Sequence, residues 1–117
     1  MTLRADASSA RAARRFLREV LRGWQCDHVV EITLLAANEL VTNAILHART
    51  ELHLLVRLHG TALRVEVVDH SDQLPVHRHV PDDATGGRGI ALIDTLSSRW
   101  GVDALPDGKR VWFEVPT

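Results

Sequence analysis

Three polar side chains that could do chemistry recur at every fourth residue of an otherwise apolar segment. Glu39, Asn43 and His47 lie within ELVTNAILHA, residues 39–48. Residues four apart share one stripe of a helix. A carboxylate can act as a base, an amide oxygen can hold a hard cation such as Mg²⁺, and a histidine can contact a polar ligand. A solvated helix face carries the same pattern, so the spacing alone leaves both interpretations open.

A fourth candidate is Asp69, near the end of the alternating segment ALRVEVVDH at 62–70. Leu63, Val65 and Val67 fall on one side of a strand, and the period of two puts Asp69 on that same side. A carboxylate at the end of a core-facing row costs free energy unless something pairs with it. Either the strand has left the core at Asp69, or its carboxylate accepts a hydrogen bond from a ligand.

Glycines at 86, 87 and 89 precede an apolar helical pattern. Glycine lets the backbone approach a ligand closely, and a helix N-terminus offers unpaired N–H groups to a phosphate. A flexible loop end carries the same residues, so the motif is weak alone. The glycines follow a loop rather than a strand, which argues against a dinucleotide-binding βαβ unit.

The elements that must position these residues follow from the hydrophobic periodicity. We expect helices at 8–23, 28–48 and 88–98, and strands at 51–60, 62–70, 100–105 and 110–115. Ser8 or Ser9 is expected to cap the first helix. The strands form two hairpins, which turn at 60–61 and at 106–109, and residues 71–87 form a long loop.

This order predicts an α+β fold. We expect a two-layer sandwich, in which a mixed, mostly antiparallel sheet is covered on one face by helices. The 117 residues suffice for one domain, 1–117, with a core that needs no metal or disulfide.

Composition narrows the class of protein. The chain is 45% apolar and 25% charged, and the single Cys26 has no partner for an internal disulfide. No start resembling a signal peptide is seen, and we expect no apolar run of membrane-spanning length. A cytoplasmic location is therefore predicted. Arginines are concentrated in the first helix, on the side opposite its apolar stripe: Arg11, Arg14, Arg15, Arg18 and Arg22.

In order and spacing, four segments together resemble a known superfamily. NELVTNAILHA, VEVVDHSDQLP, TGGRGIALIDTLSSRWGV and GKRVWFEV are similar to the N box, G1 box, G2 box and closing hairpin of the GHKL ATP-binding proteins, which share the Bergerat fold. The small size and ELVTNA…HA most resemble the anti-sigma-factor serine kinases of the RsbW/SpoIIAB type and short actinobacterial relatives.

The resemblance implies roles for the candidate residues, with ATP and Mg²⁺ as cofactors. Glu39 would activate the attacking hydroxyl or water, Asn43 would ligate Mg²⁺, and Asp69 would accept a hydrogen bond from the exocyclic amine of adenine. His47 would lie near the nucleotide.

The glycine-rich segment also gains implied roles. Gly87 and Gly89, with Arg88 between them, would bring the backbone to the phosphates, and 72–86 would be the lid over ATP. Two features depart from the superfamily. The G1 pattern DxGxG is replaced by DHSDQ at 69–73, and Arg110 falls where a threonine usually lies near adenine.

Three functions compete at this point. The first is a serine/threonine protein kinase that acts on an anti-anti-sigma (STAS) partner and sequesters a sigma factor. The second is a partner-sequestering module with weak or lost nucleotide binding. The third, ranked last, is a nucleic-acid-binding protein that uses the arginines of the first helix. We expect no membrane association and no direct nucleic-acid contact, and the resemblance implies a possible homodimer.

Overall fold

The structure is a computed structural model that describes residues 1–47, 51–70 and 97–117. The expected long loop, the glycine-rich segment and nearly all of the expected third helix lie outside the described residues. Ser97 and Ser98 are described and are not helical; the backbone N–H of Ser98 donates to the carbonyl of Glu114 at 2.9 Å. The predicted helix end at 98 is therefore wrong, because Ser98 already leads into the next strand.

Five described strands form one sheet in the order β1-β2-β3-β5-β4, and each described pairing is antiparallel. The strands are β1 Thr2–Leu3, β2 Leu52–His59, β3 Ala62–Asp69, β4 Arg99–Leu105 and β5 Gly108–Pro116. The four strands and two hairpins expected from the sequence are confirmed. The expected second turn at 106–109 is too long, because Gly108 and Lys109 already pair with β4. The short β1 pairs with β2 at one edge of the sheet.

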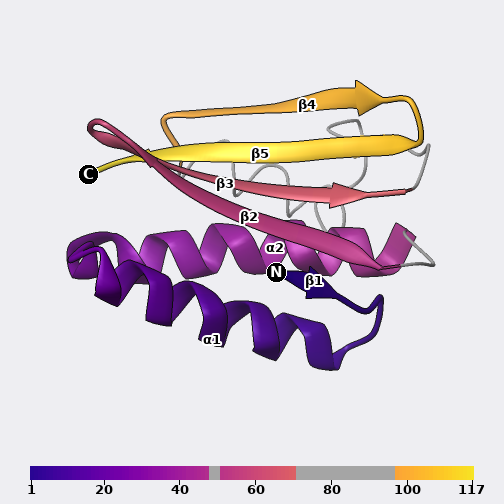
Figure 1. The fold of residues 1–117 in the computed structure, drawn as a ribbon, viewed down its shortest axis with the longest axis horizontal. Coiled ribbons are helices and arrows are strands. Elements are labelled where there is room, and N and C mark those ends of the chain that lie inside the picture. Colours follow the sequence, from indigo (N-terminus) through magenta and orange to yellow (C-terminus); the bar gives the residue numbers. More distant parts are fainter. Residues whose placement is uncertain (48–50, 71–96) are drawn as a thin grey trace, which may run out of the picture.

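Two helices cover one face of this sheet (Figure 1). They are α1 Ser8–Gly23 and α2 Val30–His47, and a 3-10 turn at Asp27–Val29 precedes α2. α2 lies against β3, and α1 packs on α2 and β1. Buried apolar side chains of both layers meet between them: Leu17, Leu21, Val41, Leu52, Leu54, Leu63, Val65 and Phe113. The expected α+β two-layer architecture is confirmed.

The start of α1 differs from the expectation. The N-cap position is Ala7, and no side chain at that position caps the helix. Instead, the Asp6 carboxylate accepts hydrogen bonds from the backbone N–H and the hydroxyl of Ser8, and the Ser9 hydroxyl donates to the carbonyl of Arg4. The predicted Ser8 or Ser9 cap is wrong because both hydroxyls bond to residues that precede the helix.

The apolar helix α2 also corrects an expectation. Residues 27–46 have a mean hydropathy of 1.5 in their most apolar window and are long enough to cross a bilayer. The expectation of no apolar run of that length is therefore wrong. Half of the window is buried inside the domain, as expected for a core helix packed on several sides. A cytoplasmic location stays a prediction.

The other face of the sheet carries charged side chains around Trp112. The guanidinium of Arg64 lies 4.0 Å from the centre of the Trp112 ring, and that of Arg99 lies 5.5 Å from it. Arg64 also bonds to Glu66 at 2.8 Å and to Glu114 at 3.1 Å. Burial opposes its charged form, but these two bonds outweigh that effect and raise the pKa of Arg64.

Candidate functional site

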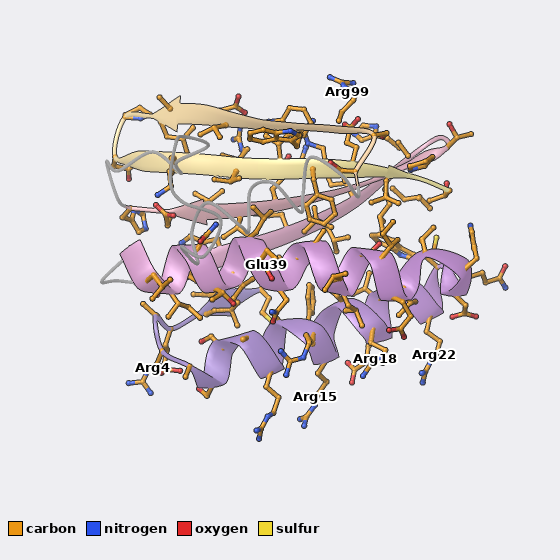
Figure 2. The ribbon with its side chains drawn as sticks, turned by 180° about the vertical axis from the view of Figure 1, so that it is seen from behind. Arg4, Arg15, Arg18, Arg22, Glu39 and Arg99 are labelled. Carbon is orange, nitrogen blue, oxygen red and sulfur yellow. The ribbon has the colours of Figure 1, made fainter. Side chains whose placement is uncertain are left out.

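The helix α2 positions two of the candidate residues on the side of the sheet that the helices cover. Asn43 is buried, with 8% of its surface exposed, while Glu39 is half-buried one helical turn earlier. Figure 2 shows Glu39 midway along α2. Apolar neighbours such as Leu40, Val41 and Ala44 are buried, and they fix α2 in place. Two polar side chains are therefore held on a rigid element rather than on a loop.

The sheet supplies the third candidate, and it confirms the argument from strand parity. Asp69 ends β3 with only 1% of its surface exposed, in line with the buried Leu63, Val65 and Val67. β5 runs antiparallel beside β3, and its Lys109 is the register partner of Asp69. The interpretation in which the strand leaves the core at Asp69 is thereby excluded.

Asp69 and Lys109 form a buried ion pair. Nζ of Lys109 lies 3.0 Å from Oδ2 and 3.2 Å from Oδ1 of Asp69, and the two side chains are 4% and 1% exposed. A buried charge costs several kcal/mol unless it is paired, so the lysine stabilises the ionised carboxylate in this place.

A cavity between α2 and the sheet brings Asn43 and Asp69 together. α2, β3 and β5 contribute its walls: Leu40, Asn43, Ala44, Val67, Asp69, Lys109 and Val111. It therefore has apolar sides and a few polar groups, and its volume of about 10 Å³ between the described walls leaves room for about one water molecule. Glu39 is not one of its described walls, although it shares a stripe of α2 with Asn43.

Other expected site residues fall outside this geometry. The backbone of His47 ends α2, but its side chain lies outside the described residues, as do Gly87, Arg88 and Gly89. Their implied contacts with ATP stay predictions. Arg110 does not reach the cavity: it lies on the other face of the sheet, 3.2 Å from Asp103.

Lys109 is a buried cavity residue that the sequence interpretation missed. Its position in the cavity was given to Arg110, one residue further along. The signal was available, because Val111, Phe113 and Val115 are the buried row of β5 and the period of two extends that row back to 109.

Among the described residues, Asn43 and Asp69 are the ones that would contact a magnesium–nucleotide complex. No group of three or more His, Cys, Asp or Glu side chains that could hold a metal by themselves occurs in the described ranges. Mg²⁺ is commonly held by one or two protein oxygens together with substrate phosphates and water. The amide oxygen of Asn43 would supply such a ligand, and the buried carboxylate of Asp69 would meet a hydrogen-bond donor on the base.

Fold and cavity together define a two-layer α+β domain with a pocket between helix and sheet. Residues 3–115 match the family described as the histidine kinase-like ATPase domain. The chain belongs to this family. The GHKL resemblance is confirmed at this level, and the closer likeness to anti-sigma-factor kinases stays a prediction.

Solved structures with a similar fold come from a light-activated kinase. One is the blue-light activated histidine kinase of Erythrobacter litoralis EL346, with a TM-score of 0.58, 25% identity and 76% of this chain covered. The histidine kinase domain from the same protein gives a TM-score of 0.52, 24% identity and 75% coverage, a likeness of fold alone. This chain spans 30% and 44% of those two chains. No curated protein matches it.

Proposed function

We propose that the protein is a Mg²⁺-ATP-dependent regulatory kinase that phosphorylates a serine or threonine of a STAS-type partner. Membership of the histidine kinase-like ATPase family supports ATP binding. The single observation that carries the finer proposal is the cavity in which a buried amide, Asn43, and a buried carboxylate, Asp69, meet from separate elements. Glu39 lies one turn before Asn43 on the same helix.

Each residue has a role that fits its surroundings. Bound Mg²⁺ would neutralise phosphate charge during transfer. Asn43 would hold that ion through its amide oxygen, and Asp69 would orient the base. Glu39 is half-buried, so its carboxylate keeps access to an incoming hydroxyl, from which it would accept a proton.

A basic face on α1 supports a protein partner of acidic character. Six arginines and two acids occur in residues 1–22, while the remaining sequence holds eight basic and thirteen acidic residues. The charge is therefore polarised although the total is −1. Figure 2 shows Arg4, Arg15, Arg18 and Arg22 along the outer side of the molecule, pointing away from the sheet. Such a face would steer an acidic surface toward α1.

Calorimetric titration with ATP tests the nucleotide site. Asn43→Ala should weaken binding by tenfold or more when Mg²⁺ is present and by much less in EDTA, because only the metal contact is removed. Asn38→Ala is the matched control: it is the same change on the same helix, at a residue that contacts Arg14 instead. Equal affinities of the two variants in Mg²⁺ would show that Asn43 holds no metal.

Phosphoryl transfer to a purified STAS-domain protein tests the catalytic role. Glu39→Gln should keep ATP affinity and lower the transfer rate about 100-fold or more, the range expected for loss of a general base. Glu31→Gln, at an exposed position in the first turn of α2, should leave the rate unchanged. If Glu39→Gln abolishes ATP binding instead, the assigned role is wrong.

The same STAS-domain protein tests the docking face. Arg18→Glu should weaken its binding, and wild-type affinity should fall as salt rises, because exposed charges are screened. Arg99→Glu is the matched control, since Arg99 lies on the far side of the sheet from α1 (Figure 2). Equal losses in both variants would exclude a specific role for α1.

A sequestering module without turnover is the second candidate. One observation favours it: DHSDQ at 69–73 lacks both glycines of the DxGxG pattern. In that case the protein would bind the STAS-domain partner with unchanged affinity whether ATP is present or absent.

A further inference from the structure

Lys109 is a buried cation that the proposed function does not use. It is the only lysine in the sequence. It lines the cavity with Asn43 and Asp69, and 3% of its surface is exposed. Within the described ranges, the only contacts recorded for its Nζ are to Asp69. An ammonium is a compact charge with three donors, whereas a guanidinium is a wide planar fork.

The ion pair offers two kinds of hydrogen-bonding group side by side. The carboxylate of Asp69 has about four acceptor sites, and the ammonium of Lys109 has three donors. The observed contacts, at 3.0 and 3.2 Å, engage at most two of those donors. The pair can therefore accept a hydrogen bond through Asp69 and donate one through Lys109 to the same ligand.

An aspartate without the lysine would bind adenine and reject guanine. The 6-position of adenine carries an amine, a donor, whereas that of guanine carries an oxygen, an acceptor. A buried carboxylate alone bonds to the amine but faces the oxygen as a second acceptor, and sites of this kind reject the wrong ligand strongly because polar groups stay unpaired. An ammonium beside the carboxylate removes that penalty, since it can donate to the oxygen while Asp69 accepts from the N1–H of the same base.

We propose that Lys109 is a specificity-determining residue and that the Asp69–Lys109 pair accepts 6-oxopurine nucleotides as well as adenine nucleotides. The proposal rests on the proposed nucleotide site. Adenine would donate its amine to Asp69 and accept at N1 from Lys109. Guanine would donate from its N1–H to Asp69 and accept at its 6-oxygen from Lys109.

The first test needs only the wild-type protein. Mg²⁺-ATP and Mg²⁺-GTP are titrated separately by calorimetry, and we expect Kd values within tenfold of each other. ATP binding with GTP more than tenfold weaker overturns this inference and leaves the proposed function standing. Failure of both nucleotides to bind overturns the proposed function, and this inference falls with it.

A second test observes Lys109 directly. Since the sequence has one lysine, selective ¹⁵N-lysine and ¹³C-lysine labelling gives one side-chain NMR signal. Both nucleotides should shift that signal to saturation. A signal that responds to neither nucleotide, although calorimetry shows binding, would place the base elsewhere and overturn the proposal.

Two substitutions separate the effect of the positive charge at position 109 from the effect of the shape of the ammonium group. Lys109→Met removes the donor and should weaken the binding of both nucleotides, GTP at least tenfold more than ATP, because the 6-oxygen of guanine then faces the Asp69 carboxylate without a donor. Lys109→Arg keeps a cation beside Asp69 and should retain GTP binding within threefold. If Lys109→Met does not fold, the Lys109→Arg variant and the wild-type protein still test the proposal. A GTP Kd more than tenfold above the ATP Kd in the wild-type protein refutes the role of Lys109.

Discussion

A β-carbon added to Gly108 would lie 1.9 Å from the backbone carbonyl oxygen of Asp69 and 2.8 Å from the Cα of His70. Only glycine lets the start of β5 come this close to the end of β3. The close approach also keeps the next residue, Lys109, in register with Asp69. The backbone at this point therefore sets the geometry of the buried ion pair.

Gly108→Ala should destabilise the protein by about 3 kcal/mol or more, because both clashing atoms belong to the backbone and cannot rotate away. A loss of that size lowers Tm by more than about 10 °C in a domain of this length. Gly23→Ala is the matched control: a β-carbon there meets nothing within 4 Å, so stability should hold or rise slightly. Similar melting curves for Gly108→Ala and wild type would show that the strand ends can separate.

The ion pair itself should show strong energetic coupling. Lys109→Met leaves the Asp69 carboxylate buried without its cation, which costs about 3–5 kcal/mol. The double variant Lys109→Met/Asp69→Leu removes both charges and should be more stable than Lys109→Met alone. Urea unfolding of the wild type, Lys109→Met, Asp69→Leu and the double variant gives the coupling free energy. Additive effects of the two substitutions would mean that the carboxylate is stabilised by other groups.

Much of the fold could be predicted because the hydrophobic period is regular where the layers meet. The α1 boundaries at Ser8–Gly23 and the hairpin at 60–61 agree with the apolar spacing. Asp69 was placed on the core face by parity alone, and the structure confirms it. The predicted helix cap was wrong because the Ser8 hydroxyl donates to the Asp6 carboxylate and the Ser9 hydroxyl to the carbonyl of Arg4. Such local side-chain bonds compete with capping.

The site was harder to predict because it depends on pairing between distant segments. Lys109 and Asp69 are forty residues apart, and their contact requires both the register of β5 on β3 and the close approach at Gly108. Sequence periodicity gives the face on which a residue lies, not its neighbour across the sheet. The sequence analysis placed Arg110 near adenine because it followed the family motif. The period of two along the strand would have placed residue 109 there instead.

The bond between Asp6 and Ser8 predicts a pH effect at the start of α1. The Ser8 hydroxyl, chiefly, lowers the pKa of the Asp6 carboxyl from its ordinary value of 3.8. A carboxyl whose folded pKa is depressed stabilises the fold above its unfolded pKa, and the contribution is lost as pH falls through the folded value. Ser8→Ala should therefore raise the pKa of Asp6 toward 3.8 in a ¹³C NMR titration. Ser98→Ala, at the start of the last hairpin, should leave the pKa of Asp6 unchanged. An unchanged pKa of Asp6 in Ser8→Ala would contradict the hydrogen bond between the two residues.

The arginines of α1 should differ in their contribution to stability although they share one helix face. Arg14 donates to the amide oxygen of Asn38 at 2.9 Å, in a partly buried contact between α1 and α2. Arg15 is exposed, and no hydrogen bond or ion pair is recorded for it within the described residues. Arg14→Ala should cost about 1–2 kcal/mol of stability, and Arg15→Ala less than about 0.5 kcal/mol.

Asn38→Ala should cost about as much stability as Arg14→Ala. Combining Asn38→Ala with Arg14→Ala should add little, since both substitutions remove the same bond. Chemical denaturation of the four variants measures these losses. A loss below about 0.5 kcal/mol for Arg14→Ala as well would contradict a stabilising role for its bond to Asn38.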